Sequence, residues 1–391
     1  MTSKTFAAND PEMKKRIRNP KTVADFFAGI GLVSMGLDDA GWKTVYALDY
    51  DKDKAAAYAN HFGSAHYLTQ DVALTKGRDV PDVTLAHASF PCTDLSVAGA
   101  RKGIRHGESS AFWEFTRILS EMKKHHGEGK PPFVLLENVE GLITSHDGED
   151  LKAVLLALND IGYRVDLLRI DASHFVPQSR VRIFIVGIHE SLVENPETDF
   201  MTKEQNLTSS NVRSEKIVRY IAHHPEIKWH FQRLPNLPDL KISLKEIIDV
   251  DEEWWPEERT CRLYDQMHPR HRKLIDERKK DKQYSYFTAF RRMRMREGEK
   301  RSTAELRTDG IAGCLRTPKG GSARQILVRV GKGTFDARLI NGKEAARLMG
   351  AGKFKLNPSL TLNQMLFGFG DAVCVPAVAW LARNYLNKIV A

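Results

Sequence analysis

The sequence predicts an α/β protein with a mainly parallel, doubly wound sheet and a second, smaller domain. Short apolar runs alternate with helical patterns over residues 21–187, which is typical of strands and helices wound into a parallel sheet. The alternation stops near His189, and residues 225–301 are rich in Trp, Pro and Arg instead. We therefore expect ligands at the carboxyl ends of the strands in the first domain.

Each element follows from local periodicity and flanking turn residues. We expect strands at residues 22–27, 44–49, 82–87, 133–136, 163–170 and 182–188. We expect helices at residues 111–123, 151–161, 341–349 and 375–386. Residues 195–214 are polar and are expected to form a loop, whereas residues 225–301 are expected to form an irregular, β-containing domain.

Length and composition limit the class of protein. A chain of 391 residues with 42% apolar and 28% charged residues can bury a substantial core and hold two domains. Its four cysteines are far apart and form no C-x-x-C pair, so we expect neither zinc nor disulfides. No run of 18 apolar residues occurs and the N-terminus is polar, so we expect a cytoplasmic protein without a membrane span.

Positive charge is concentrated in one segment. The net charge is +9, and residues 270–301 hold 13 Lys/Arg against 5 Asp/Glu. A local positive field suits a polyanion such as nucleic acid. The alternative is a solvated, charged helix at residues 271–282.

A glycine-rich turn follows the first strand. Gly29 and Gly31 would let a cofactor approach the backbone at a helix N-terminus. Asp49 ends the second strand, where an acidic side chain can accept hydrogen bonds from ribose hydroxyls. A nicotinamide or flavin enzyme would share this pattern, and a purely structural turn is the other alternative.

Two candidate catalytic side chains follow later strands. Cys92 comes directly after Pro91 and close behind the strand at 82–87, which makes its thiolate a candidate nucleophile. Glu137 follows the strand at 133–136, so its carboxyl group would meet Cys92 at one sheet edge and could hold or donate a proton. The alternatives are a buried structural cysteine and an ordinary helix-capping Glu-Asn pair.

Two arginines alternate where another strand begins. Arg180 and Arg182 would point to one face, and Gln178 precedes them. One guanidinium could bind a carbonyl group and the other a phosphate or Glu137. The alternative is a pair of solvated arginines at a strand end.

In this order and spacing, these motifs resemble those of the DNA (cytosine-5) methyltransferases of the bacterial restriction-modification type. The motifs are Phe27-x-Gly29-x-Gly31, Pro91-Cys92, Glu137-Asn138-Val139 and Gln178-x-Arg180-x-Arg182, and the resemblance covers residues 22–189 and 305–391. It implies a Rossmann-like, S-adenosylmethionine-dependent methyltransferase sheet with a smaller target-recognition domain. It also implies methyl transfer to carbon 5 of a flipped cytosine in a short double-stranded DNA sequence, with S-adenosylhomocysteine as product and no metal.

The resemblance assigns roles by position in this sequence. Cys92 would be the nucleophile, Glu137 would act at ring N3, Arg182 would hold the base carbonyl, and Arg180 would support the pocket. Contacts with S-adenosylmethionine are expected from Phe27, Gly29, Gly31, Asp49, Tyr50, Asp71, Val72, Pro91, Asp371 and Ala372. Contacts with DNA are expected from Ser96, Gln178, Arg291, Arg292, Arg294, Arg307 and Arg316.

Three positions depart from the usual motifs of the family. Thr93 stands where Gln is usual, Leu32 stands where Gly is commoner, and Asp371 stands where Asn is usual. Asp371 keeps hydrogen-bond acceptors but lacks the amide donor. Since Cys92, Glu137 and both arginines are intact, we still expect activity.

The resemblance also divides the chain and suggests its partners. We expect a basic N-terminal arm (1–21), a catalytic domain (22–189), a target-recognition domain (190–338), and a hinge and C-terminal segment that returns to the catalytic domain (339–391). We expect a monomer that acts on double-stranded DNA in the bacterial cytoplasm and is associated with the nucleoid through that DNA. A cognate restriction endonuclease would be a partner by function only.

Two alternatives remain open. One is a tRNA cytosine-5 methyltransferase on the same fold, and the other is a catalytically silent DNA-binding relative. The tRNA enzymes carry a Cys-Phe-Thr signature, whereas this chain has Tyr286-Phe287-Thr288. The intact catalytic residues disfavour the silent relative.

Overall fold

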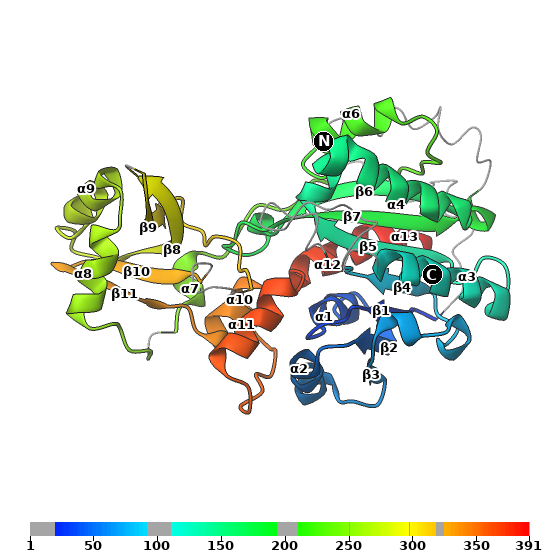
Figure 1. Ribbon diagram of the computed structural model, residues 1–391, viewed down its shortest axis with the longest axis horizontal. Helices are drawn as coiled ribbons and strands as arrows, with labels where there is room; N and C mark the ends of the chain where they lie inside the picture. Colours follow the sequence, from blue (N-terminus) through cyan, green and yellow to red (C-terminus); the bar gives the residue numbers. More distant parts are fainter. Residues whose placement is uncertain are drawn as a thin grey trace, which may run out of the picture.

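Two sheets in two lobes organise the chain (Figure 1). The computed structural model describes residues 20–91, 111–193, 210–249, 251–296, 298–317 and 324–390. The larger lobe holds a seven-stranded sheet, and the smaller lobe holds a four-stranded sheet. The predicted nucleophile Cys92, the predicted DNA contact Ser96 and residues 1–19 of the N-terminal arm lie outside the described residues.

The seven-stranded sheet has the strand order β3-β2-β1-β4-β5-β7-β6. Its strands are β1 (Thr22–Phe26), β2 (Lys43–Asp49), β3 (Tyr67–Thr69), β4 (Leu85–Ala88), β5 (Phe133–Val139), β6 (Tyr163–Asp171) and β7 (Val181–His189). Neighbouring strands from β3 to β5 are parallel, whereas β7 runs antiparallel to both β5 and β6. The predicted mainly parallel α/β sheet is confirmed, with β3 as an additional short strand.

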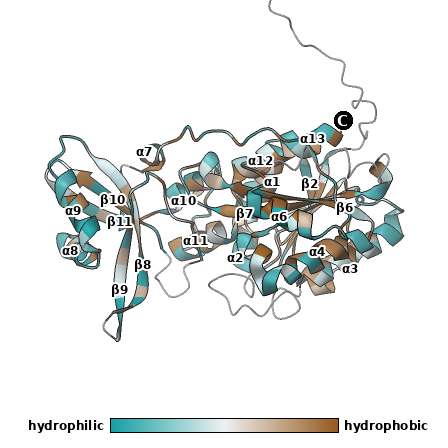
Figure 2. Cartoon of the chain, turned by 90° about the horizontal axis from the view of Figure 1, so that it is seen from above, coloured by the Kyte–Doolittle hydropathy of each residue, from teal (hydrophilic) through white to brown (hydrophobic). Residues whose placement is uncertain are grey.

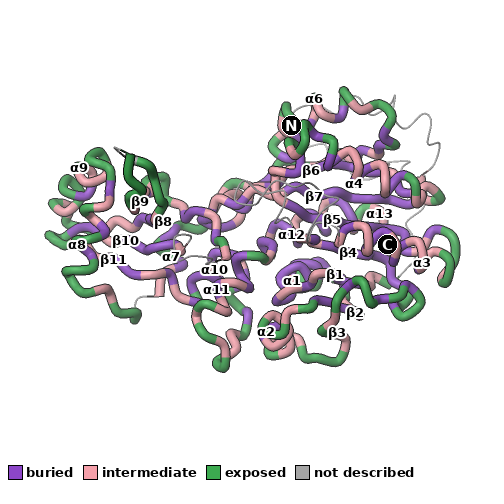
Figure 3. Tube along the Cα trace, in the orientation of Figure 1, coloured by how far each residue is buried: buried purple, intermediate pink, exposed green. Residues whose placement is uncertain are grey.

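Helices cover both faces of this sheet (Figure 1). The helices are α1 (Leu32–Asp38), α2 (Lys52–Phe62), α3 (Ala111–His126) and α4 (Glu149–Asp160). Helices α3 and α4 bury their apolar sides in one core, with Phe115 and Leu155 fully buried. Helix α1 faces a second core through Val33 and Leu37. Figure 3 shows the strands as the most buried part of this lobe.

Part of the segment expected in the recognition domain packs on the catalytic lobe instead. Helix α6 (Glu215–His223) and Trp229 belong to the same core as α4, and Val165 of β6 pairs with Trp229. The buried Arg213 guanidinium binds the Asp166 carboxylate of β6 at 2.5 Å. Residues 210–238 therefore pack on the larger lobe.

The smaller lobe contains β-strands, as expected, but they form a regular antiparallel sheet with the order β11-β10-β8-β9 and not an irregular domain. Its strands are β8 (Ser285–Arg296), β9 (Glu299–Arg307), β10 (Ile326–Gly331) and β11 (Thr334–Leu339). Helices α8 (Glu257–Asp265) and α9 (Pro269–Arg278) cover one face through Leu263 and Ile275.

Strands β8 and β9 extend beyond the rest of this sheet. Strand β10 pairs with β8 only over residues 285–289, whereas β9 pairs with residues 288–296. The outer part of the hairpin is therefore a two-stranded ribbon that projects from the lobe (Figure 2).

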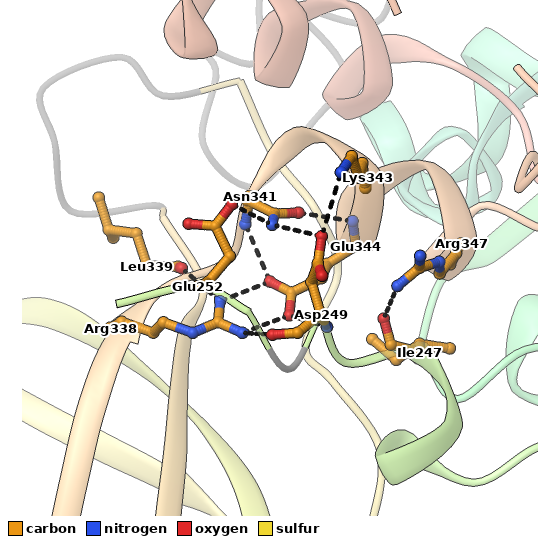
Figure 4. A network of polar contacts seen from close by, with 9 residues as sticks. All are labelled: Ile247, Asp249, Glu252, Arg338, Leu339, Asn341, Lys343, Glu344 and Arg347. Atoms are coloured by element: carbon orange, nitrogen blue, oxygen red, sulfur yellow. Dashed lines mark hydrogen bonds and ion pairs between the residues drawn. The ribbon is translucent and has the colours of Figure 1, made fainter. Parts of the chain in front are cut away.

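A buried polar network joins the two lobes (Figure 4). Arg338 of β11 donates two hydrogen bonds to Glu344 of α10 (Gly342–Leu348), at 2.8 and 2.6 Å. A third bond from Arg338 reaches the carbonyl oxygen of Asp249, and the Asp249 N–H donates to Glu344. Asn341 caps α10 in a capping box with Glu344. The network lies near residue 339, where the hinge was expected. It also includes the short helix α7 (Leu244–Ile247), because the carbonyl oxygen of Ile247 accepts a hydrogen bond from Arg347.

The C-terminal helices run from the hinge into the catalytic lobe. They are α11 (Leu362–Asp371), α12 (Val375–Leu381), a π-helical turn (Ala382–Leu386) and α13 (Asn387–Ile389). Helix α12 packs closely on α1 because Gly36 of α1 has no side chain. A Cβ at Gly36 would lie only 2.7 Å from the Cβ of Val378. The run Leu362–Ile389 is long and apolar enough to cross a membrane by composition, yet 67% of its most apolar window is buried in the protein.

Candidate active site

The loops at one edge of the large sheet carry the predicted site residues. Strands β1, β2, β4 and β5 are parallel, so their carboxyl ends meet at the same edge. The chain order reverses between β1 and β4, which is the position where such sheets bind ligands.

The glycine-rich turn after β1 has an unusual backbone. Phe27, Gly29 and Gly31 have φ values of 58°, 56° and 85°, a left-handed conformation that is costly for a side chain such as Phe27. A Cβ at Gly31 would lie 2.6 Å from the rings of Tyr58 and Phe62. A Cβ at Gly29 would meet only Lys54, at 4.0 Å. Gly31 is therefore required for packing, and Gly29 leaves the backbone open to a ligand.

Asp49 combines a structural role with free acceptor capacity. Its Oδ2 accepts a hydrogen bond from the Gly29 N–H at 2.9 Å, and its Oδ1 accepts one from the Asp51 N–H at 3.0 Å. A carboxylate has about four lone-pair positions, so both oxygens can still accept from ribose hydroxyls. Burial raises the pKa of Asp49, although Lys54 acts in the opposite direction. The adjacent Tyr50 is 65% exposed. These features fit a ligand that carries a ribose and an adenine ring.

Asp71, Val72 and Pro91 lie at the ends of the strands beside this turn. Asp71 is exposed and caps the short 3-10 turn Val72–Leu74, because its Oδ1 accepts from the Ala73 N–H at 2.9 Å. Val72 is buried in the core next to the sheet. Pro91 is partly exposed, directly after the loop that leaves β4.

Asp371 has a partner that the sequence did not reveal. The Lys54 Nζ lies 2.8 Å from Asp371 Oδ2, which joins α2 to the end of α11 across 317 residues of chain. Burial lowers the pKa of Lys54, but the charges of Asp371 and Asp49 outweigh it, and the net shift is upward. Lys54, which lies beside the turn, thus neutralises the negative charge that Asp371 carries in place of the usual Asn. Ala372 follows, and its carbonyl accepts from Arg180.

Glu137 and Arg182 form an ion pair at the ends of β5 and β7. Arg182 Nε lies 2.9 Å from Glu137 Oε1, and both side chains are largely buried. Glu137 Oε1 accepts no well-directed hydrogen bond from the described residues, so the contact is chiefly electrostatic. The Asn138 amide donates to the carbonyl of Phe90 at 3.2 Å. This bond fixes the end of β5, which carries Glu137, against the segment that leads to Pro91.

Arg180 joins three parts of the chain. It is 2% exposed and donates to the carbonyl oxygens of Leu315 (2.8 Å), Gly370 (2.9 Å) and Ala372 (2.5 Å). Burial lowers the pKa of Arg180, and the nearby charge of Arg182 contributes. Its guanidinium group therefore holds the loop that carries Leu315 and the C-terminal segment beside β7.

Cys314 lies beside the same guanidinium. Arg180 Nη1 lies 3.3 Å from its sulfur. Burial acts to raise the pKa of Cys314, but the charges of Arg180, Arg182 and Arg316 outweigh it, so the net shift is downward.

Gln178 requires a correction. It is fully buried, donates to the carbonyl of Leu348 at 2.7 Å, and accepts from the Leu315 N–H at 2.9 Å. Its amide is used inside the protein, so we assign it a structural role in place of the DNA contact expected from the sequence.

The arginines expected to contact DNA are not one cluster. Arg291 points to the face of β8 that carries α8, where it donates to Gln266. Arg292 and Arg294 alternate with Arg291 along β8 and so point to its other face. Both pair with the Glu305 carboxylate: Arg292 Nε lies 3.9 Å from Oε2, and Arg294 Nη2 lies 2.5 Å from Oε1. The two remaining candidates lie at the end of β9 and beyond it: Arg307 is the last residue of β9 and pairs with Asp309, whereas Arg316 lies in the following loop and is exposed.

A buried His–Asp pair under the site was missed in the sequence. His87 Nδ1 lies 2.7 Å from Asp25 Oδ1, and these residues are direct neighbours on β4 and β1. Ser34 donates to the other Asp25 oxygen, and Ser89 lies 3.3 Å from the other ring nitrogen of His87. Two ionisable residues inside apolar strands were the signal that could have revealed this pair. Among the residues that the structure describes, no group of acidic, His or Cys side chains is arranged to hold a metal.

Comparison with known proteins agrees with this geometry. Residues 21–387 match the family model described as C-5 cytosine-specific DNA methylase. The type II methyltransferase M.BsuFI of Bacillus subtilis is 34% identical over 193 residues, which cover 49% of this chain and 45% of that protein. M.Bsp6I of Bacillus sp. (strain RFL6) is 36% identical over 169 residues, which cover 42% of this chain and 51% of that protein. The chain thus spans about half the length of these curated relatives.

Solved structures confirm the fold. The S. pombe Dnmt2 methyltransferase superposes with a TM-score of 0.56 at 17% identity, over 93% of this chain and 97% of that chain. The Entamoeba histolytica methyltransferase EhMeth gives a TM-score of 0.61 at 12% identity, over 95% and 98% of the two chains. At these identities the likeness concerns the fold alone.

Proposed function

The chain belongs to the C-5 cytosine-specific DNA methylase family, and from this premise we propose that it methylates carbon 5 of cytosine in double-stranded DNA. The observation that supports this most directly is the Glu137–Arg182 ion pair, which Asn138 ties to the segment before Pro91-Cys92. The carboxyl group of Glu137 and the guanidinium group of Arg182 thus lie at one strand edge. We propose that a pyrimidine ring binds there and that Cys92, which follows Pro91 in the sequence, supplies the thiol.

Glu137 and Arg182 would bind the base. The carboxyl group of Glu137 would hold a proton at ring N3, and the Arg182 guanidinium would donate to the exocyclic carbonyl. In the structure they neutralise each other at 2.9 Å. An entering cytosine would exchange part of that contact for hydrogen bonds to its own edge.

Cys92 would activate the base. Its thiolate would add to carbon 6, forming a carbon–sulfur bond and moving an electron pair toward carbon 5. The proton held by Glu137 would limit negative charge on the ring. Carbon 5 would then bond to the methyl group as its bond to the sulfonium breaks, with S-adenosylhomocysteine as the leaving group. Loss of the carbon 5 proton to a base and departure of the thiolate from carbon 6 would restore the aromatic ring and the free enzyme.

S-adenosylmethionine would be held at the turn after β1. Asp49 would accept from the ribose hydroxyls, Tyr50 would lie against adenine, and the open backbone at Gly29 would allow close approach. The remaining expected contacts are Phe27, Gly31, Asp71, Val72, Pro91, Asp371 and Ala372. The cofactor supplies a methyl group on a sulfonium, an electrophile that the activated carbon 5 can attack.

DNA would bind to both lobes. The cytosine must leave the duplex to reach the strand edge, so base flipping is required. Ser96, Arg291, Arg292, Arg294, Arg307 and Arg316 are the side chains that we propose as DNA contacts. We further propose a monomer in the bacterial cytoplasm that associates with the nucleoid through DNA and protects that DNA from a cognate restriction endonuclease.

Transfer of a tritiated methyl group tests this proposal. We expect label from S-adenosylmethionine on unmethylated duplex DNA, and bisulfite sequencing should place it at one short recurring sequence. The Cys92→Ser variant should show no turnover on the same DNA. Label on tRNA but not on DNA would support an RNA enzyme instead, and no label on either would support a catalytically silent protein.

A further inference from the structure

Three arginines converge on a cavity in the smaller lobe. The cavity has a volume of about 210 Å³ and is lined by Arg259 of α8, Arg291 of β8, Arg324 before β10, Ile326 and Leu339. None of these five residues is acidic. From this geometry we infer that the cavity binds a backbone phosphate of the DNA duplex, an inference that rests on the proposed function.

The guanidinium groups are held in place by their surroundings. Arg259 stacks on the Trp255 ring at 3.9 Å from the ring centre, and Arg291 lies 5.8 Å from the same centre. Arg291 Nε also donates to the Gln266 side chain at 2.9 Å. An aromatic face orients a guanidinium group without neutralising its charge. The terminal nitrogens of Arg259 and Arg291 therefore remain available to a ligand.

The cluster lacks a counter-charge. Among the residues with described positions, no carboxylate forms an ion pair with Arg259, Arg291 or Arg324, although most ordered arginines of this lobe have such a partner. Arg324 Nε is buried without a hydrogen-bond acceptor there. Burial, and next the charge of Arg259, lowers the pKa of Arg291. An anion in the cavity would satisfy the unpaired donor and relieve the repulsion between like charges.

The position of the cavity favours the DNA backbone as the source of that anion. Arg291 stands where the β8–β9 ribbon leaves the sheet. Arg324 and Leu339 also line a second, smaller pocket with Leu315 and Arg316. The Leu315 carbonyl accepts from Arg180 of the active site. The cavity thus lies between the projecting ribbon and the loop that contacts the catalytic lobe, where a duplex bound for methylation would pass.

A salt titration of DNA binding tests the inference. Dissociation constants would be measured by fluorescence anisotropy across a range of NaCl concentrations. One duplex would contain the target sequence of the enzyme, and the other would lack it. Arg259→Gln and Arg324→Gln should each reduce the slope of log Kd against log salt by about 0.9, the value for one phosphate contact. Both duplexes should lose affinity by the same factor, because a phosphate carries no sequence information.

Arg262→Gln is the matched control. Arg262 lies one turn from Arg259 on α8, is exposed, and pairs with Glu258, so its loss should leave the slope unchanged. Arg259 is itself exposed. We therefore expect Arg259→Gln to fold, so that it still tests the inference if Arg324→Gln is misfolded.

The outcomes separate this inference from the proposed function. An unchanged slope in the Arg259 and Arg324 variants, with DNA methylation intact, would overturn the phosphate site alone. A loss confined to the duplex with the target sequence would also overturn it, since that result indicates base reading. Failure of the unaltered protein to bind either duplex would overturn both proposals.

Discussion

Glu137 must serve two partners in turn. In the structure its carboxylate is paired with Arg182 at 2.9 Å in a largely buried site. In the proposed reaction it would also hold a proton at the base, so part of its contact with Arg182 would have to give way when a base enters.

Glu137→Gln should separate chemistry from binding. The amide preserves size but cannot exchange a proton, so the single-turnover rate of methyl transfer should fall roughly 10²- to 10⁴-fold. The dissociation constant for duplex DNA should change far less. Equal losses in rate and binding would contradict the acid–base role of Glu137.

Lys54 and Asp371 should behave as a unit in cofactor binding. Each single variant, Lys54→Ala or Asp371→Asn, leaves one charge unpaired near Asp49. The double variant removes both charges and restores the Asn that is usual in the family. We expect calorimetry with S-adenosylhomocysteine to show a coupling energy of about 0.2–1 kcal/mol, as for partly exposed ion pairs. Strictly additive effects would show that the pair does not act on the cofactor site.

Among the elements, the hinge between β11 and α10 depends on one buried ion pair. The Arg338 and Glu344 side chains are 3% and 0% exposed. Breaking such a pair leaves a buried charge without its partner. Glu344→Gln should therefore lower the free energy of unfolding by about 3–5 kcal/mol in urea titrations. Glu258→Gln, which breaks an exposed pair on α8, should cost less than about 1 kcal/mol. Similar costs for both variants would mean that the network does not stabilise the hinge.

The end of α11 depends on a close backbone contact. A Cβ at Gly370 would lie 2.6 Å from the Thr317 nitrogen and 2.7 Å from the Arg316 carbonyl carbon. Neither backbone atom can rotate away as a side chain could. Gly370 therefore lets the loop that contains Arg316 and Thr317 lie against the C-terminal segment that Arg180 binds.

Gly370→Ala should separate these two segments. We expect a fall in the methylation rate with the helical content unchanged by circular dichroism. Gly352→Ala is the control, because its Cβ would meet only the Arg347 side chain at an ordinary 3.7 Å. A Gly370→Ala enzyme with the unaltered rate would show that the contact is dispensable.

At the scale of the whole molecule, the sequence predicted the larger lobe better than the smaller one. Alternating apolar runs and helical patterns identified every strand of the large sheet except β3, which has three residues. Ordered motifs placed Gly29, Asp49 and Glu137 at one edge, since parallel strands share that edge.

Long-range contacts could not be predicted in this way. The Lys54–Asp371 and Arg180–Gly370 contacts join residues 317 and 190 positions apart. The resemblance to the family suggested Gln178 as a DNA contact, and only the fold shows that its amide bonds Leu348 and Leu315 inside the protein. The regular sheet of the smaller lobe was missed because the outer part of β8 has no buried apolar side: Arg292 and Arg294 are exposed, and so are Met293 and Met295 beside them.

Covalent trapping tests the central claim, that Cys92 attacks carbon 6 of a flipped cytosine. A duplex with 5-fluorocytosine at the mapped target carries fluorine where a proton must leave carbon 5, so the enzyme cannot release the methylated base. With S-adenosylmethionine present, we predict a denaturation-resistant complex whose mass equals protein plus DNA strand plus one methyl group, with the DNA on the peptide that contains Cys92. A Cys92→Ala variant that forms the same complex, or DNA attached to another residue, would contradict the account.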